Sequence, residues 1–359
     1  MSVRNVAIVG CGIGRNHMLE GYNNHRDRFQ VLAVCDLNEE RLNKFADEFG
    51  IPRRTTSFDE VLGMADIDII DVCTPPGVHY AMVTAALRVG KDVICEKPLV
   101  GNLAQVDEII AAEREARGRV MPIFQYRWGD GYGKAQHLIR TGVAGKPYLA
   151  TAETSWFRGP DYYAVPWRGK WDTELGGTLL THAIHTHDLM TGLMGEVATV
   201  SAEIATRVNT IEVEDCAIAN LRMQSGALVS LAVTVGSFEQ ITRLRLCFEN
   251  VTMESTLSPY NPGLDPWKFT PRDDAAKARV EEALRDWQPI PSRFQGQMGA
   301  YADALDSNGP LPVTLADARR SLELLTAIYH SADSGTRVTM PISGDHPKYR
   351  SWRPTDQAA

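Results

Sequence analysis

The sequence predicts an α/β protein of two domains, the first built on a parallel sheet and the second on a largely antiparallel sheet. The chain has 359 residues, which is more than one compact core usually serves. Strand-like and helical patterns alternate up to about residue 124, as they do around a parallel sheet with right-handed crossovers. Beyond that point strand-like patterns follow one another with few helices between them, which favours antiparallel pairing. We therefore predict domains at 1–123 and 124–359, the second including a C-terminal tail.

Short apolar runs mark the strands of the first domain, and a turn and a helical pattern follow each of them. The first run ends at Gly10 and the second at Asp36. Ser57 is a residue type that often caps a helix N-terminus, and acidic residues follow it where the first helical turn would lie. The predicted strands are 6–9, 31–35, 67–73, 92–95 and 120–124, and the predicted helices begin at about 16 or span 39–49, 80–89 and 103–117.

The second domain combines strand-like runs with helices that would cover one face of their sheet. Residues 261–293 are rich in proline and charge, which indicates an excursion with a short helix, and the tail from 343 is polar. The predicted strands are 148–156, 198–208, 216–223, 227–235 and 242–248, and the predicted helices are about 131–141, 178–194, 296–306 and 315–332.

Composition excludes several classes of partner. The formal net charge is -8 and no basic stripe is present, so a nucleic-acid partner is not expected. No apolar run is long enough to span a membrane, and the N-terminus lacks the pattern of a signal peptide. The six cysteines form no C-x-x-C pair, which is typical of reduced thiols in the cytoplasm. We expect a cytoplasmic protein without a membrane partner.

The first predicted strand leads into a glycine-rich turn, Gly10-Cys11-Gly12-Ile13-Gly14. Only glycine lets a diphosphate approach the backbone N–H groups at the start of a helix. The spacing G-x-G-x-G is one residue shorter than the usual G-x-G-x-x-G, but a strand precedes it and a helix follows. Asp36 ends the next strand, where a carboxylate accepts both ribose hydroxyls and repels a 2′-phosphate. The pattern predicts a Rossmann domain that binds NAD; the alternative is a strand-capping aspartate beside a structural turn.

Two later loops also follow strands and so reach the carboxyl edge of the sheet, where open α/β sheets bind ligands. One contains Thr74, Pro75 and His79; the other contains Glu96 and Lys97. A desolvated lysine over the nicotinamide can exchange a proton with a hydroxyl, although a solvated Glu–Lys pair is an alternative interpretation. The residues expected to contact NAD are Gly10, Gly12, Ile13, Gly14, Asp36, Thr74, Pro75, His79, Glu96 and Lys97.

Several short motifs together resemble those of the Gfo/Idh/MocA oxidoreductase family, and they span nearly the whole chain. They are the glycine turn with its trailing His17, Thr74-Pro75-Pro76 with His79, Glu96-Lys97-Pro98, Tyr126-Arg127, Gly145-Lys146-Pro147, Gly176-Gly177 with His185 and Asp188, Glu214-Asp215, Gly226-Ala227-Leu228 and the helix near 322–332. The resemblance implies a Rossmann domain followed by an α/β domain on an open, mostly antiparallel sheet. It also implies association through the open face of that sheet, so a homodimer or homotetramer is expected.

The resemblance further implies a role for His185, which would bind the reacting hydroxyl or act as the base together with Lys97. Many similar dehydrogenases have an aspartate four residues earlier, where this chain has Thr181. Threonine can position a hydroxyl but cannot take its proton, so Lys97 and His185 would carry the acid–base work, with His182 assisting. Zinc held by His182, His185 and Asp188 is an alternative, but we expect no metal.

Several aromatic and arginine residues lie in or beside the segments that lead into the second, substrate-binding half of the chain. Aromatic faces stack on the C–H faces of sugar rings, and guanidinium groups bind hydroxyls or a carboxylate. We expect Arg127, Trp156 and Arg168 to bind substrate together with Thr181, His182 and His185. Similar side chains nearby are Arg158, Trp167 and Trp171, and the alternative for each tryptophan is a place in the core or in an interface.

These observations predict an NAD(H)-dependent dehydrogenase or reductase that acts on a CH–OH group. Hydride would pass between the nicotinamide and a hydroxyl or keto carbon of a sugar, cyclitol or related polyol. An NAD-dependent hydrolase or lyase that oxidises a sugar transiently is one alternative. A sensor that binds NAD(H) without catalysis and a zinc-dependent enzyme are two others.

Overall fold

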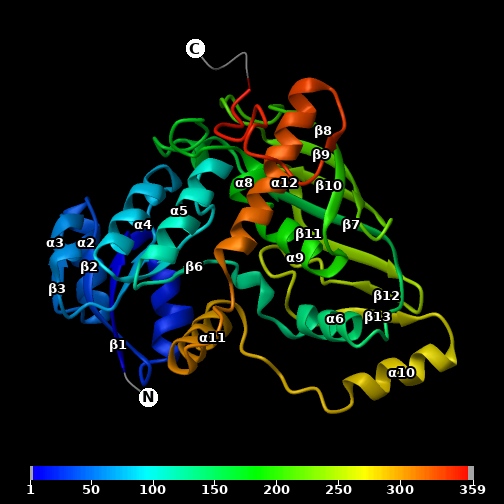
Figure 1. Ribbon diagram of the computed structural model, residues 1–359, viewed down its shortest axis with the longest axis horizontal. Coiled ribbons are helices and arrows are strands. Elements are labelled where there is room, and N and C mark those ends of the chain that lie inside the picture. The colour runs from blue at the N-terminus through cyan, green and yellow to red at the C-terminus, as the bar shows by residue number, and fades with distance from the viewer. Residues whose placement is uncertain (1–2, 355–359) are drawn as a thin grey trace. The chain divides into compact units, whose positions relative to one another are not determined.

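The computed structural model describes residues 3–354, which form two compact units (Figure 1). The first unit takes in residues up to 125 together with 293–319, and the second takes in 126–292 and the chain from 320 onward. The predicted second domain takes in all of 124–359. The segment 293–319 is a correction to that assignment, because it returns to the first unit.

The first unit is built on a six-stranded parallel sheet with the order β3-β2-β1-β4-β5-β6, which confirms the predicted Rossmann topology. Each strand pairs with its neighbours in the same direction because helices return the chain across the sheet. The strands are β1 (Arg4–Val9), β2 (Phe29–Cys35), β3 (Arg53–Thr55), β4 (Ile69–Val72), β5 (Asp92–Cys95) and β6 (Val120–Pro122). The helices are α1 (Cys11–Asn16), α2 (Glu39–Phe49), α3 (Phe58–Gly63), α4 (His79–Arg88), α5 (Leu103–Glu115) and α11 (Arg293–Ser307).

The first helix begins earlier than the sequence predicts. It starts at Cys11 instead of near Asn16 and continues beyond Asn16 as a π-helical turn. Gly10 makes this possible with a φ of 104°, and a Cβ there would lie 2.5 Å from the Cys73 carbonyl oxygen. A Cβ on Gly14 would lie 2.8 Å from a methyl carbon of Ile8. The two glycines therefore let the helix start directly against the ends of β1 and β4.

Helix α11 belongs to the first unit because its buried face packs there. The Phe294 ring lies 4.6 Å from the His17 ring, and Tyr301 stacks on Phe29 at 6.3 Å. The amide of Gln297 hydrogen-bonds backbone groups at the end of β6. A polar, proline-rich stretch precedes this helix, so its sequence carried no indication of the domain to which it returns.

The second unit is built on an eight-stranded sheet with the order β13-β12-β11-β7-β10-β9-β8-β14. All neighbouring strands are antiparallel except β7 and β10, which confirms the predicted mostly antiparallel sheet. The three short strands β12, β13 and β14 were not predicted. The strands are β7 (Pro147–Phe157), β8 (Val197–Ala205), β9 (Cys216–Met223), β10 (Leu228–Thr234), β11 (Gly236–Phe248), β12 (Val251–Glu254), β13 (Lys268–Pro271) and β14 (Val338–Thr339).

Side chains on β9 and β10 alternate between buried and accessible, so helices cover only one face of the sheet. The predicted helix 178–194 is two helices, α8 and α9, separated at His182 and Ala183. The N–H groups of both residues bond to the Thr178 carbonyl, and the regular ladder resumes at His187. The helices of this unit are α6 (Asp130–Arg140), α7 (Pro160–Tyr163), α8 (Thr178–Thr181), α9 (Ile184–Met194), α10 (Asp274–Leu284) and most of α12 (Leu315–Ser334).

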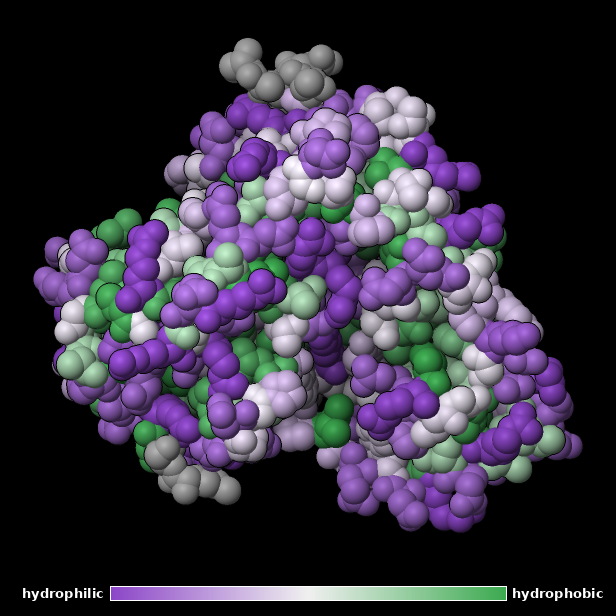
Figure 2. All heavy atoms as spheres, viewed as in Figure 1, coloured by the Kyte–Doolittle hydropathy of each residue, from purple (hydrophilic) through white to green (hydrophobic). Residues whose placement is uncertain are grey.

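Hydrophilic side chains dominate the face shown in Figure 2, and hydrophobic ones form scattered groups between them. Within the described part of the chain, no helix combines the length and the apolar character needed to cross a bilayer.

Candidate active site

Four strands of the first unit end in register, and this creates a common edge. Val9 pairs with both Cys35 and Val72, and Val72 pairs with Cys95. The glycine turn, Asp36 and the loops that carry Thr74 and Lys97 directly follow these ends. The fold therefore places the predicted cofactor-contacting segments at one edge of the sheet, as open α/β proteins do for their ligands.

The three glycines of the turn differ in the space that a side chain would have at each position. Gly10 and Gly14 are needed for packing, since a Cβ on either would meet protein atoms within 3 Å. A Cβ on Gly12 would meet no protein atom within 4 Å, so packing does not explain its lack of a side chain. Gly12 and its neighbour Ile13 are both exposed. The open backbone at Gly12 fits the close approach of a diphosphate.

Asp36 is buried at the end of β2, and its carboxylate has four donors. One oxygen accepts from the Cys11 N–H at 2.8 Å and the Arg41 Nε at 2.9 Å. The other accepts from the Asn38 N–H at 2.9 Å and the Arg41 Nη2 at 2.6 Å. Burial opposes ionisation, but these donors hold the pKa of Asp36 below its usual value. Arg41 was not among the predicted site residues, although it lies only five residues beyond Asp36.

Glu96 is fixed by a buried network beneath the loop that carries Lys97. One of its oxygens lies 3.0 Å from His17 Nε2, and the other accepts the Lys97 backbone N–H at 3.0 Å. His17 Nδ1 lies 2.8 Å from Asp71, which also accepts the Tyr22 hydroxyl at 2.8 Å. Burial alone would lower the pKa of His17, but Asp71 outweighs it and raises that pKa well above its ordinary value. Glu96 thus supports the backbone beside Lys97 and does not face solvent.

His17, Asp71 and Cys73 are the one group of side chains in the described residues with the spacing of a metal site. Their hydrogen bonds explain the proximity without a metal. Both His17 nitrogens already lie against carboxylates, and burial raises the pKa of the Cys73 thiol far above neutrality. Metal binding needs a thiolate and a free imidazole nitrogen, so this cluster fits a hydrogen-bonded network better.

His79 connects the two loops at the edge of the sheet. Its ring nitrogens lie 2.9 Å from the Pro98 carbonyl and 2.8 Å from the Thr74 carbonyl. The ring is fully buried, and burial lowers its pKa, so it is neutral. Thr74 is half-buried and Pro75 is exposed. Of these predicted contacts, only the last two are accessible, and His79 instead links the two loops.

In the second unit, Arg127 forms a paired contact with Asp188 on α9. Its Nε and Nη2 donate to the two carboxylate oxygens at 2.7 and 2.6 Å. The adjacent Tyr126 ring stacks on the His185 ring at 4.4 Å. The guanidinium edge suited to an anion thus already holds a carboxylate, and the substrate role of Arg127 stays a prediction. Asp188 is likewise committed to Arg127 and not to the zinc alternative.

Breaking this pair is expected to be costly because only 4% of the Asp188 side chain is exposed. We expect Asp188→Asn to lower the free energy of unfolding by about 3–5 kcal/mol, since the part-buried Arg127 guanidinium would lose this buried carboxylate. Asp172→Asn is the matched control, because Asp172 pairs with Arg353 while 80% exposed, and it should change the same quantity by less than about 1 kcal/mol. Urea unfolding measures both; equal effects would contradict the structural role.

Thr181 orients the His182 ring. Its hydroxyl donates to the Gly177 carbonyl at 2.8 Å and lies 2.7 Å from His182 Nδ1. Because the hydroxyl gives its one proton to Gly177, it accepts from the Nδ1–H of His182. The His182 ring also meets Trp156 edge-on at 5.5 Å and lies 5.6 Å from Tyr162. The structure thus brings together three of the predicted substrate-binding residues, Thr181, His182 and Trp156.

Arg168 is engaged by its own neighbours. Its Nη1 donates to the Tyr162 hydroxyl and to Glu174, and the guanidinium lies 4.3 Å from the Trp167 ring centroid. Glu174 is buried and also accepts the Gly169 backbone N–H. A substrate that bound Arg168 would therefore have to compete with the Arg168–Glu174 ion pair.

The buried carboxylate of Glu214 holds the start of α8 and thereby the Thr181 segment. It accepts the N–H groups of Gly177 and Leu179, both at 3.0 Å. Burial raises the pKa of Glu214 to about 7, against the opposing effect of these donors. His187 on α9 is also buried, and burial lowers its pKa to about 4, so it is neutral.

This shift predicts a pH dependence of stability. The folded state holds the Glu214 proton more tightly than the unfolded chain does. Protonated Glu214 therefore contributes fully to the free energy of unfolding below pH 4.5, and this contribution is lost as the pH rises through about 7. Glu214→Gln has no carboxyl to ionise, so between pH 4.5 and about 7 the free energy of unfolding of the variant should rise relative to that of the parent. Urea unfolding at several pH values measures the difference; parallel curves would contradict the prediction.

Comparison with known proteins identifies the chain. Residues 4–124 match the model described as "Oxidoreductase family, NAD-binding Rossmann fold", and residues 132–254 match the GFO/IDH/MocA C-terminal domain. The chain belongs to the Gfo/Idh/MocA family. As a member of this family it is an NAD-dependent oxidoreductase.

Relatives of this Gfo/Idh/MocA oxidoreductase match along most of its length. D-apiose dehydrogenase of Rhizobium rhizogenes is 25% identical over 339 residues, which cover 92% of this chain and 96% of that protein. Myo-inositol 2-dehydrogenase of Thermotoga maritima is 28% identical over 205 residues, 55% of this chain and 59% of that protein. The WlbA dehydrogenase of Bordetella pertussis, crystallised with NADH and UDP-GlcNAcA, has a TM-score of 0.82 and 27% identity over 95% of this chain and 100% of that chain.

In this oxidoreductase some of the predicted site residues bind other parts of the protein, whereas the two residues predicted to be catalytic are Lys97 and His185. Glu96, His79 and Arg127 are occupied by structural contacts. Lys97 is half-buried at the carboxyl edge, and His185 is buried on α9 beneath the Tyr126 ring.

Proposed function

We propose that the protein transfers hydride between NAD(H) and a hydroxyl or keto carbon of a sugar, cyclitol or related polyol. The observation that carries this proposal is the convergence of Gly12, Asp36 and Lys97 at one edge of a parallel sheet. The names of the relatives support the substrate class, since they specify D-apiose and myo-inositol.

Lys97 and His185 are the groups we assign to proton exchange with the reacting hydroxyl. NAD, when bound, supplies the hydride acceptor, or the donor in the reverse direction. Glu96 holds the Lys97 backbone, and Thr181 holds the His182 ring through Nδ1. Asp36 would accept the ribose hydroxyls, which requires Arg41 to yield at least part of its hold on the carboxylate. Trp156 is buried, with 4% of the residue exposed, and supports the His182 ring by edge-on packing while its indole N–H donates to Thr242.

The relatives' names favour a dehydrogenase over the other functions considered. They do not support a hydrolase or lyase with transient oxidation, nor a sensor without catalysis. The zinc alternative needs Asp188, whose two oxygens accept from Arg127.

We also propose a cytoplasmic homodimer or homotetramer that has no nucleic-acid partner. The uncovered face of the second sheet supports self-association, because Ile218, Leu228 and Leu149 on three adjacent strands are 58%, 48% and 44% exposed. The net charge of -8 disfavours a phosphate backbone as partner.

A substrate panel with NAD and NADP tests the proposed function. Sugars, cyclitols and sugar acids are offered to the intact protein, and the absorbance of the reduced nicotinamide is followed. We expect at least one polyol to reduce NAD, with NADP used less well. Product formation without net NADH would favour the hydrolase or lyase, and no turnover with bound NADH would favour the sensor.

A further inference from the structure

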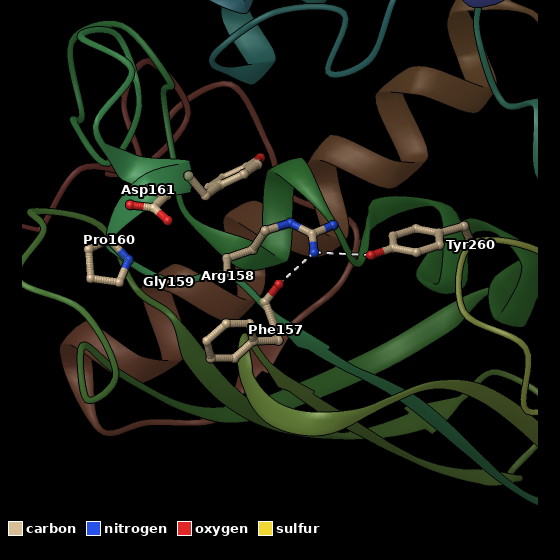
Figure 3. A pocket seen from close by; sticks show the side chains of 7 residues that line it. Phe157, Arg158, Gly159, Pro160, Asp161 and Tyr260 are labelled. Atoms are coloured by element: carbon tan, nitrogen blue, oxygen red, sulfur yellow. Dashed lines mark hydrogen bonds between the residues drawn. The ribbon is translucent and has the colours of Figure 1, made fainter.

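A cavity of about 560 Å³ opens in the second unit beside the aromatic cluster around His182. Arg158 lies in its wall, together with Phe157, Tyr162 and Tyr260 (Figure 3). Residues from two chain segments about a hundred positions apart thus share one wall. The guanidinium reaches across this wall toward the Tyr260 hydroxyl.

Aromatic rings surround the Arg158 guanidinium. Its central carbon lies 5.3 Å from the Trp156 ring centroid, 5.1 Å from Tyr162 and 5.5 Å from Tyr260. Such rings hold a guanidinium in place by cation–π attraction and limit its access to water. The group is therefore positioned before any ligand arrives.

One nitrogen of the Arg158 guanidinium, Nη1, makes several hydrogen bonds. Nη1 donates to the Phe157 carbonyl at 2.6 Å, to the Tyr260 hydroxyl at 3.0 Å and toward Gln240 at 3.3 Å. Every one of these acceptors is neutral. All three contacts use Nη1, and the Tyr162 hydroxyl, which also hydrogen-bonds the Arg158 side chain, is a further neutral group.

Other arginines of the chain show what a guanidinium edge is suited to bind. Arg127 and Arg41 each use Nε and Nη2 together to hold both oxygens of a carboxylate. Among the described residues no carboxylate pairs with Arg158, which lines a pocket instead of lying in the protein interior. A planar carboxylate matches two parallel N–H groups, which makes the contact both strong and directional.

No protein carboxylate compensates the charge of Arg158 in the described part of the chain. Asp161 also lines the cavity, but its carboxylate is directed away from the guanidinium (Figure 3). Arg168, the other guanidinium on Tyr162, already pairs with Glu174. The cavity therefore holds one cation that is fixed, partly desolvated and without an anion.

We propose that Arg158 binds a carboxylate of the substrate, so that the preferred substrate is a sugar acid and not a neutral sugar. This inference rests on the proposed function and specifies its substrate class. The shared ring contacts place the site near the predicted substrate-binding residues, since Trp156 and Tyr162 contact both Arg158 and His182.

Matched pairs of probes test the proposal with the full-length protein and saturating NAD. The acids D-glucuronate, D-galacturonate and D-gluconate are compared with D-glucose, D-galactose and D-glucitol, and D-glucose 6-phosphate tests a different anion. Binding of each probe to the NADH complex is measured by saturation-transfer NMR alongside turnover. The proteins are the parent, Arg158→Met, Arg158→Lys and, as a control, Arg279→Met on the exposed face of α10.

We expect the parent to prefer at least one acid over its neutral partner. Arg158→Met should lower kcat/KM for that acid about 10- to 100-fold and leave the neutral partner nearly unchanged. Arg158→Lys should recover part of the loss, because it keeps the charge but not the paired geometry. Arg279→Met should match the parent.

Three results would overturn the inference. They are a parent that prefers neutral sugars, equal losses for acid and neutral partners in Arg158→Met, and a response confined to the sugar phosphate. Turnover of neutral sugars alone would leave the proposed function standing and remove the carboxylate assignment. If no probe reduced NAD or bound the NADH complex, both the inference and the proposed function would be wrong.

Discussion

Lys97→Met is expected to lower kcat about 10²- to 10⁴-fold, because it removes the group that we assign to proton exchange at the reacting hydroxyl. NADH binding should change little, since the Glu96 contact is made by the Lys97 backbone and does not need the side chain. Steady-state oxidation of the best polyol from the panel gives kcat, and NADH fluorescence titration gives cofactor affinity.

Two further variants separate chemistry from charge. Lys97→Arg keeps a cation that does not release its proton near neutral pH, so it should be as inactive as Lys97→Met. Lys44→Met on the exposed side of α2 should match the parent. If Lys97→Met retained more than about a tenth of the parent kcat, the proton-exchange role of Lys97 would be wrong.

Asp36→Ala is expected to weaken NADH binding about 10- to 100-fold, because two hydrogen bonds from the ribose to a carboxylate would be lost. The preference for NAD over NADP should narrow as well, since Arg41 would remain to attract a 2′-phosphate. Fluorescence titration with NADH and NADPH measures both effects.

Arg41→Met is the matched control for this prediction. It keeps Asp36 and removes the guanidinium that occupies both carboxylate oxygens. NADH should therefore bind the variant at least as well as the parent. An Asp36→Ala protein with unchanged NADH affinity would show that this carboxylate serves only the Cys11 N–H and the turn.

The order of strands and helices in the first unit could be predicted because each strand is a short apolar run with a turn at its end. The edge strand β3 escaped prediction because its three residues, Arg-Arg-Thr, contain no apolar run. The early start of α1 also escaped, because it depends on the close contact of Gly10 and Gly14 with β1 and β4, which spacing alone does not reveal.

In the site, the sequence indicates residue types more directly than the contacts that those residues make. Arg127 and Glu96 lie in motifs of the family, yet each has a protein partner that is distant in sequence. Asp188 is 61 residues from Arg127, and His17 is 79 residues from Glu96. A sequence shows which side chains can bind an anion or a cofactor, but the fold decides which of them are already occupied.

The same reasoning explains why Arg158 was not singled out. In the sequence it is one of several arginines near tryptophans, with the same chemistry as Arg168. The structure distinguishes them, because Arg168 pairs with Glu174 and Arg158 pairs with no described carboxylate.

The transfer of deuterium from substrate carbon to cofactor tests the central claim most directly. Intact protein is incubated with NAD and a polyol that carries deuterium on its carbons, and the released nicotinamide cofactor is analysed by mass spectrometry. We predict NADH that has gained one deuterium for each substrate molecule oxidised. Cofactor that remains as unlabelled NAD while the polyol is consumed would contradict the assignment of the protein as a dehydrogenase.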